Sequence, residues 1–388
     1  HEFVTTEYSA DFIMDLLSKV FTELHPAASL DGVKVLHSQK MGFSGATVMD
    51  VECKWVTSSS PPPPARLFIK EIVLAPLART EPEAAQARWQ RNLQSYKNDL
   101  MFQTQYAPLL RQRGVHVPIT FHASHQPSSN DNEAEKFWFV SESLNDTAQQ
   151  VAELNEVQLQ SALEWLAQFH GMFQGSFSPA SAGFASKGVN QVEANIWSEG
   201  THLALRKRPA NEVAKLPTAW SGFCHAFGIS EFAPLGERLA AIAPQVAAAL
   251  CPPSQSEKER IRRKMTIVHG DYKPGNLFFA KQCSQEDIKA ASIRTYAIDF
   301  QWSGFGIGAT DLIYLIAAGS SDELVASFSD IKEAVLKPYF TFFTAARKEF
   351  QNEQFSYTFE DLVFDFQLAT LDFLRWAFCA RLGGETQK

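Results

Sequence analysis

The stretch IVHGDYKPGNLFF, residues 267–279, is the part of this chain that says most about its fold. Apolar runs enclose a polar octet, HGDYKPGN. Runs of β-branched and aromatic residues bounded by Gly and Pro favour covered strand positions. We therefore predict two short buried strands with a rigid polar loop between them. Loops held on a rigid scaffold often carry the chemistry of a protein, and this loop presents Asp271 and Asn276.

Composition limits the class of protein. The chain has 388 residues, enough for two or three domains with a large core. Hydrophobic residues make up 45% and charged residues 20%, which is typical of a soluble globular protein. The net charge of −8 argues against a nucleic-acid-binding protein, which would show a basic face. No apolar run is long enough to span a membrane.

The first residues and the cysteines indicate the compartment. The N-terminal HEFVTTEYSADF carries acidic residues where a signal peptide has basic ones, so we expect no secretory signal there. The five cysteines are far apart and form no C-x-x-C pair, which argues against a disulfide framework or a metal site. They are Cys53, Cys224, Cys251, Cys283 and Cys379. We expect a reducing, cytoplasmic setting. The oligomeric state stays open.

The N-terminal third is expected to be a small, mostly antiparallel sheet with one long helix. Apolar residues recur at helical spacing over residues 5–25, and a second helix is predicted around 82–112. Strand-like runs follow the β pattern and are expected at 34–41, 46–56, 65–72, 119–124 and 137–142. The stretch SSSPPPP, residues 58–64, is predicted to be a solvated loop, because four prolines do not fit a sheet interior.

After Asn145 the sequence is mainly helical. Amphipathic helices are predicted over residues 157–174, 233–250, 322–350 and 358–382, with a further strand at TYAIDF, residues 295–300. The fold class is therefore α+β. We predict two lobes, a nucleotide-binding lobe at 1–145 and a catalytic and substrate-binding lobe at 146–388, with a ligand cleft between them.

Three oxygen-bearing side chains suit a magnesium–phosphate site. Asp271 and Asn276 lie on one short loop, and Asp299 ends the apolar run YAID. Mg²⁺ takes oxygen ligands, usually one or two carboxylates together with phosphate oxygens. Phosphoryl transfer needs such a metal, a base that orients the attacking hydroxyl, and cations on the phosphates.

HGDYKPGN resembles the protein-kinase catalytic loop H-R-D-x-x-x-x-N. It resembles even more the H-x-D-x-x-x-x-N loop of the aminoglycoside phosphotransferase and choline-kinase group. AIDFQWSGFGIGATDLIYLI, residues 297–316, looks like that group's metal-binding segment, and its D-F-Q is similar to the ecdysteroid-kinase-like and choline-kinase-like branches. The resemblance is strong over 265–316 and weaker over 30–145. It implies a protein-kinase-like two-lobe fold with a β-rich N-lobe and a mainly helical C-lobe.

Carried over residue by residue, the resemblance gives roles to the loop. Asp271 looks like the catalytic base that accepts the proton of the substrate hydroxyl, and Lys273 matches a lysine that touches the transferring phosphate. Asn276 and Asp299 would hold Mg²⁺. Gly275 would let the backbone turn tightly.

The resemblance also implies a nucleotide site in the N-lobe. Lys70 matches the strand lysine that pairs with the α- and β-phosphates of ATP, with Asp99 as its acidic partner. Gly42 and Gly45 belong to GFSGATVMDVE, which resembles the phosphate-covering loop. The adenine would be held by backbone groups of Ser141, Glu142, Ser143 and Leu144.

Several of these residues also have a purely structural interpretation. His269 is expected to shape the loop rather than react, and His170 to be a buried core histidine. Asp311 is either a helix N-cap or a buried anchor for the catalytic loop. Without the resemblance, Lys70 would be interpreted as a surface lysine, and Gly42 and Gly45 as hairpin-turn residues.

The sequence thus predicts an ATP- and Mg²⁺-dependent enzyme that phosphorylates a hydroxyl group of a small molecule. The acceptor is an amino alcohol, an aminoglycoside-like or a steroid-like compound, and the residue pattern does not choose among them. Two alternatives remain, a catalytically silent nucleotide-binding pseudokinase scaffold and a protein kinase. The absence of D-F-G and of an A-P-E-like segment near 310–330 disfavours the protein kinase.

Overall fold

The computed structural model divides the chain into two compact units. One, the N-terminal unit, comprises His1–Pro108 and Val117–Gln149, and the other, the C-terminal unit, comprises Leu109–His116 and Gln150–Lys388. The structure describes residues 8–42, 45–58, 61–78, 80–129, 133–176, 178, 196–281, 293–350 and 356–382. The first unit is rich in strands and the second is mainly helical, so the predicted α+β class is confirmed.

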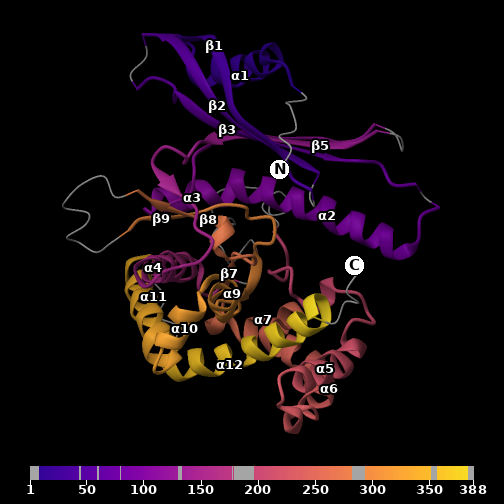
Figure 1. The fold of residues 1–388 in the computed structure, drawn as a ribbon. Helices are drawn as coiled ribbons and strands as arrows, with labels where there is room; N and C mark the ends of the chain where they lie inside the picture. The colour runs from indigo at the N-terminus through magenta and orange to yellow at the C-terminus, as the bar shows by residue number, and fades with distance from the viewer. Residues whose placement is uncertain are drawn as a thin grey trace. The chain divides into compact units, whose positions relative to one another are not determined.

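The N-terminal unit is built on a five-stranded antiparallel sheet (Figure 1). Its strands are β1 (Ala28–Lys40), β2 (Ala46–Thr57), β3 (Arg66–Leu74), β4 (Thr120–Gln126) and β5 (Glu135–Glu142), in the order β1-β2-β3-β5-β4. The short β6 (Ala148–Gln149) ends the unit. The predicted strands of this region are thus present, although β1 begins at Ala28 instead of at the expected residue 34.

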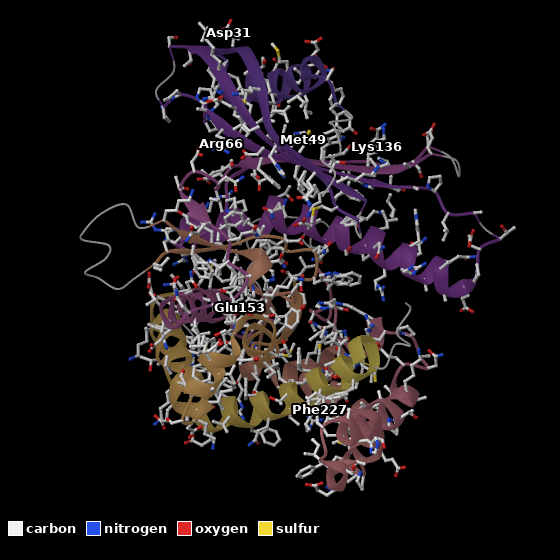
Figure 2. The ribbon with its side chains drawn as sticks, in the orientation of Figure 1. Asp31, Met49, Arg66, Lys136, Glu153 and Phe227 are labelled. Carbon is white, nitrogen blue, oxygen red and sulfur yellow. The ribbon has the colours of Figure 1, made fainter. Side chains whose placement is uncertain are left out.

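Two helices cover opposite faces of this sheet. Helix α1 (Ala10–Leu24) places Ile13, Leu17 and Phe21 against one face, and Met49 of β2 (labelled in Figure 2) belongs to the same cluster. Helix α2 (Glu83–Met101) packs its apolar side against the other face, where Phe137 of β5 lies. Alternate residues of a strand point to opposite faces, which is why β2, β3 and β5 contribute to both clusters.

The long helix predicted at 82–112 is one continuous helical segment with a change of pitch. Helix α2 passes into a π-helical turn at Phe102–Tyr106 and then into α3 (Ala107–Gln112). A π-turn inserts one extra residue per turn and redirects the side chains that follow.

The C-terminal unit contains most of the helices. They are α4 (Glu156–Phe173), α5 (Leu216–Ala226), α6 (Leu235–Leu250), α7 (Gln255–Arg260), α9 (Ala309–Gly319), α10 (Asp322–Ser327), α11 (Lys337–Phe350) and α12 (Phe359–Trp376). π-helical turns at Lys332–Leu336 and Ala377–Leu382 precede α11 and follow α12. Helix α4 packs on α11, and α12 packs on both α6 and α9. Among the described residues, no helix is long and apolar enough to cross a membrane.

The two strands predicted around HGDYKPGN are present as β7 (Met265–Val268) and β8 (Leu277–Ala280). They do not pair with each other. Strand β7 pairs with β10 (Gly304–Ile307), and β8 pairs with β9 (Thr295–Ala297), both antiparallel. Strand β10 was not predicted, because its sequence GFGI is half glycine and lacks a strand-like pattern.

Candidate active site

Asp271 lies at the centre of a compact polar cluster in the loop between β7 and β8. Its carboxylate is only 8% exposed. Lys273 Nζ lies 3.0 Å from Oδ1 and 2.9 Å from Oδ2, and Asn276 Nδ2 donates to Oδ2 at 3.0 Å. The Asn276 amide also donates to the Asp271 carbonyl at 2.8 Å. The structure therefore brings three of the predicted site residues into direct contact, around one carboxylate.

The backbone of this loop is held by Asp311 on α9. The carboxylate accepts hydrogen bonds from His269 N at 2.7 Å and from Gly270 N at 2.9 Å, and it is almost fully buried. The N-cap of α9 is Gly308, so of the two structural roles predicted for Asp311 the anchor is confirmed and the N-cap is wrong. The same carboxylate lies 3.1 Å from Nε2 of His170.

His269 is fully buried and shapes the loop, as predicted. Its Nδ1 accepts a hydrogen bond from Asp271 N at 3.3 Å, and its Nε2 lies 3.0 Å from the Ile298 carbonyl, so Nε2 carries the proton. Burial lowers the pKa of His269, although Asp311 and Asp271 oppose this shift. His269 is thus a neutral group, and it links the loop to the segment that leads to Asp299.

The tight position of the loop is Gly270 and not Gly275. Gly270 has φ +83°, a left-handed conformation that other residues rarely adopt. A Cβ atom at this position would lie 2.3 Å from the Trp302 carbonyl oxygen. Gly275 lies inside the short 3-10 turn Pro274–Asn276, where no such conformation is needed. The expected role of Gly275 is therefore corrected.

The pairing of β8 with β9 brings Asp299 to the same end of this hairpin as Asn276. Leu277 lies opposite Ala297, and Ile298 N donates to the Asn276 carbonyl at 3.0 Å. Asp299 follows directly, is partly exposed, and has φ +65°, which is unusual for a residue with a side chain. Such strained backbones occur at functional sites when surrounding contacts enforce them.

The donor set of Asn276 and Asp299 fits a hard divalent cation. The Asn276 amide uses Nδ2 for both of its hydrogen bonds, and among the described residues its Oδ1 accepts none. That oxygen is therefore available to a ligand. Within the described ranges, no group of three or more His, Cys, Asp and Glu side chains forms a complete metal cage. Mg²⁺ at a phosphate site needs no such cage, because nucleotide oxygens and water complete its shell.

In the N-terminal unit, the structure pairs Lys70 with Asp99. Lys70 on β3 places Nζ 3.1 Å from Asp99 Oδ2 on α2, and the lysine also lies over the ring of Phe139. The side chains are 20% and 3% exposed, respectively. Gln103 donates to the other Asp99 oxygen at 3.4 Å. The two residues named from the sequence as a pair are thus in contact, although they lie on different elements.

The segment predicted to hold adenine is fixed by a residue that the sequence analysis did not identify. Asp50 on β2 accepts hydrogen bonds from Ser143 Oγ at 2.9 Å and from Asn145 Nδ2 at 2.8 Å. Arg66 on β3 (labelled in Figure 2) donates to both Asp50 oxygens, at 3.2 and 2.6 Å, and also contacts Asp146. Burial alone raises the pKa of Asp50, but these hydrogen bonds outweigh it and hold the pKa below its ordinary value.

The other predicted residues of this segment and of the phosphate loop have ordinary surroundings. Ser141 and Glu142 end β5, with Glu142 N donating to the Ile119 carbonyl at 2.8 Å, and Leu144 is buried. Gly45 has φ +65° at the turn that leads into β2, and Gly42 is exposed. Residues 43 and 44, between these glycines, lie outside the described residues.

Comparison with known proteins identifies a family model that covers most of the chain. A model described as the phosphotransferase enzyme family matches residues 87–341, well over half of the chain. Among curated proteins, none matches the sequence.

Several solved structures are similar to the chain at low identity. An amicoumacin kinase in complex with AMP-PNP, Ca²⁺ and Ami is 14% identical, with 89% of this chain and 82% of that chain covered and a TM-score of 0.44. A macrolide 2'-phosphotransferase from Brachybacterium faecium is 15% identical, with 98% and 99% covered and a TM-score of 0.37. A choline kinase from Streptococcus pneumoniae is 12% identical, with 93% and 98% covered and a TM-score of 0.33.

Proposed function

This chain belongs to the phosphotransferase enzyme family, and from that membership we propose that it transfers the γ-phosphoryl group of ATP to a hydroxyl group of a small molecule. The family match confirms the resemblance found in the loop HGDYKPGN, and with it the class of enzyme, a small-molecule kinase. The nucleotide, the metal, the acceptor and the role of each side chain belong to the proposal.

The observation that carries the proposal is the polar cluster on Asp271. One carboxylate is contacted by a cation and by an amide from its own loop, while the loop backbone is fixed by a buried aspartate from α9. Such a carboxylate has a fixed direction, and a fixed direction is the main requirement for a base that must meet one hydroxyl proton.

We assign the roles as follows. Asp271 orients the acceptor hydroxyl and takes its proton on a carboxylate oxygen as the phosphoryl group is transferred. Lys273 is in contact with that carboxylate and supplies a positive charge close to the transferring phosphate. Lys70, held by Asp99, would pair with the nucleotide phosphates, and backbone groups of Ser141–Leu144 would hold the base.

Asn276 and Asp299 would hold Mg²⁺ through the amide Oδ1 and a carboxylate oxygen. A bound Mg²⁺ ion would offset the negative charge of the phosphate oxygens. The hairpin of β8 and β9 supports this assignment, because it brings the two residues to one end of the same two-stranded unit.

The proposal is tested by incubating the protein with Mg-ATP and a diverse metabolite extract. ADP release is measured, and mass spectrometry identifies any compound that gains one phosphate group. We expect one or a few alcohols to be phosphorylated, and we expect the Asp271→Asn variant to lose this activity by about 10²–10⁴-fold. Exposed Asp322 on α10 provides the control substitution Asp322→Asn, which should leave the rate unchanged.

Two companion measurements, phosphorylation of a peptide library and ATP binding, separate the alternatives. Phosphate incorporation into a peptide library, with none into small alcohols, would favour a protein kinase. ATP binding without turnover on any alcohol would favour a pseudokinase scaffold. Either outcome contradicts the proposal.

A further inference from the structure

Residues 196–204 of the C-terminal unit lie between α4 and α5. They contact the loop between β7 and β8, which carries Asp271, and the segment between β9 and β10, which begins near Asp299. We name this stretch the bracing segment. Its Thr201 N donates to the Trp302 carbonyl at 2.9 Å, and Gly200 N donates to the Phe305 carbonyl at 2.9 Å. These bonds hold the bracing segment against the backbone that follows Asp299.

His202 extends this contact to the catalytic loop. His202 N donates to the Gly270 carbonyl at 3.4 Å, and Nδ1 of the ring lies 3.1 Å from the same oxygen. A carbonyl oxygen only accepts, so Nδ1 carries the ring proton. The same Nδ1 lies 3.8 Å from Asp271 Oδ1, so His202 lies beside that carboxylate together with Lys273 and Asn276.

Three aromatic rings fix the orientation of the imidazole. Its ring centre lies 5.9 Å from Trp302, 5.4 Å from Tyr314 and 5.4 Å from Trp376, and the last two rings meet it edge to face. The His202 side chain is 18% exposed, so part of it still reaches the surface beside Asp271. Burial lowers the pKa of His202 to about 4, although Asp271 opposes this shift, and the ring is therefore neutral near pH 7.

We propose that His202 is a positioning residue for Asp271, because its Nδ1–H group donates to the Gly270 carbonyl, which directly precedes Asp271, and its ring lies beside the carboxylate. This rests on the proposed function. As a neutral donor, His202 adds no second cation to the carboxylate that Lys273 already pairs with, and it fixes the carbonyl that directly precedes Asp271. The aromatic rings keep the donor in place, and Trp302, which contacts His202, also ties the bracing segment to the loop of Asp299.

The position of the donor can be tested with two polar substitutions that differ by one methylene. An Asn side chain places its amide N–H near the site of Nδ1, whereas a Gln side chain places it near the site of Nε2. His202→Phe provides a third variant that fills the aromatic surroundings without any donor. The measurements are kcat and KM for the acceptor found in the metabolite screen, KM for ATP, AMP-PNP affinity and the melting temperature.

We expect His202→Asn to keep kcat within about threefold of the original chain. His202→Gln and His202→Phe should lower kcat by about 10- to 100-fold, the effect of a misplaced catalytic group, with KM for ATP and AMP-PNP affinity unchanged. All rates are compared at a temperature at which every variant is folded. If the His202→Phe variant melts at too low a temperature to be assayed, the comparison of kcat between His202→Asn and His202→Gln tests the proposal.

Three results would overturn the inference. Full kcat in His202→Phe or His202→Gln would show that the donor is dispensable, and equal loss in Asn and Gln would show that its position does not matter. A change confined to melting temperature would reduce His202 to a core residue. Asp271→Asn in the same assay tests the proposed function separately. If that variant kept its activity, the function would fail, whatever His202 does.

Discussion

Replacing Asp311 by Asn tests whether the catalytic loop depends on its anchor. The carboxylate accepts two backbone hydrogen bonds, at 2.7 and 2.9 Å, one on each oxygen. An amide offers one oxygen, so in either orientation one buried N–H faces an NH₂ group. Losing a charge-assisted bond costs about 1.5–3 kcal/mol, and an unpaired buried donor costs about 1–3 kcal/mol. We therefore expect the free energy of unfolding to fall by about 3–5 kcal/mol.

The assay is urea unfolding followed by tryptophan fluorescence, together with kcat measured at a temperature at which the variant is folded. Displacement of His269–Asp271 should lower kcat by about 100-fold. The control Asp322→Asn alters an exposed aspartate and should change stability by less than about 0.5 kcal/mol. A loss below about 1 kcal/mol for Asp311→Asn, with kcat preserved, would refute the anchoring argument.

Three further predictions concern other parts of the structure. Lys70→Met should raise KM for ATP by about 10- to 100-fold, whereas Lys54→Met, at an exposed lysine on β2, should leave it unchanged, as enzyme kinetics will show. Gly270→Ala should destabilise the protein by about 1–3 kcal/mol in urea unfolding and lower kcat, since its φ of +83° is strained for alanine. The hydrogen bond from Arg263 lowers the pKa of Asp361 to about 2 from 3.8. This pair therefore stabilises the protein fully above pH 3.8, and the contribution is lost as the pH falls through about 2. The original chain should be more stable than Asp361→Asn by about 1 kcal/mol of unfolding free energy at both pH 7 and pH 5. This difference should become smaller only below pH 3.8.

The sequence was most informative where periodicity and local motifs coincide. Strands β2 and β3 follow an alternating apolar pattern, and α4 has a capping box that begins at Asn155, so their positions could be predicted from neighbouring residues alone. The loop HGDYKPGN was predictable for the same reason, since its polar residues stand out between two apolar runs.

Residues whose partners are distant in the chain gave weaker signals. Asp50 occupies a polar position of the alternating pattern of β2, and Arg66 is the first residue of β3, so the local pattern marks neither their ion pair nor the bonds from Ser143 and Asn145 to Asp50. His202 had no signal at all, because a single histidine between two helices acquires its contacts with Gly270 and three aromatic rings only through folding.

The central claim is that Asp271 receives the proton of the acceptor hydroxyl during phosphoryl transfer. The most direct measurement is a single-turnover, rapid-quench rate with Mg-ATP and the acceptor found by the metabolite screen, for the original chain and for Asp271→Asn. We predict a rate lower by about 10²–10⁴-fold in the variant, with AMP-PNP affinity retained. An unchanged single-turnover rate in Asp271→Asn would contradict the claim.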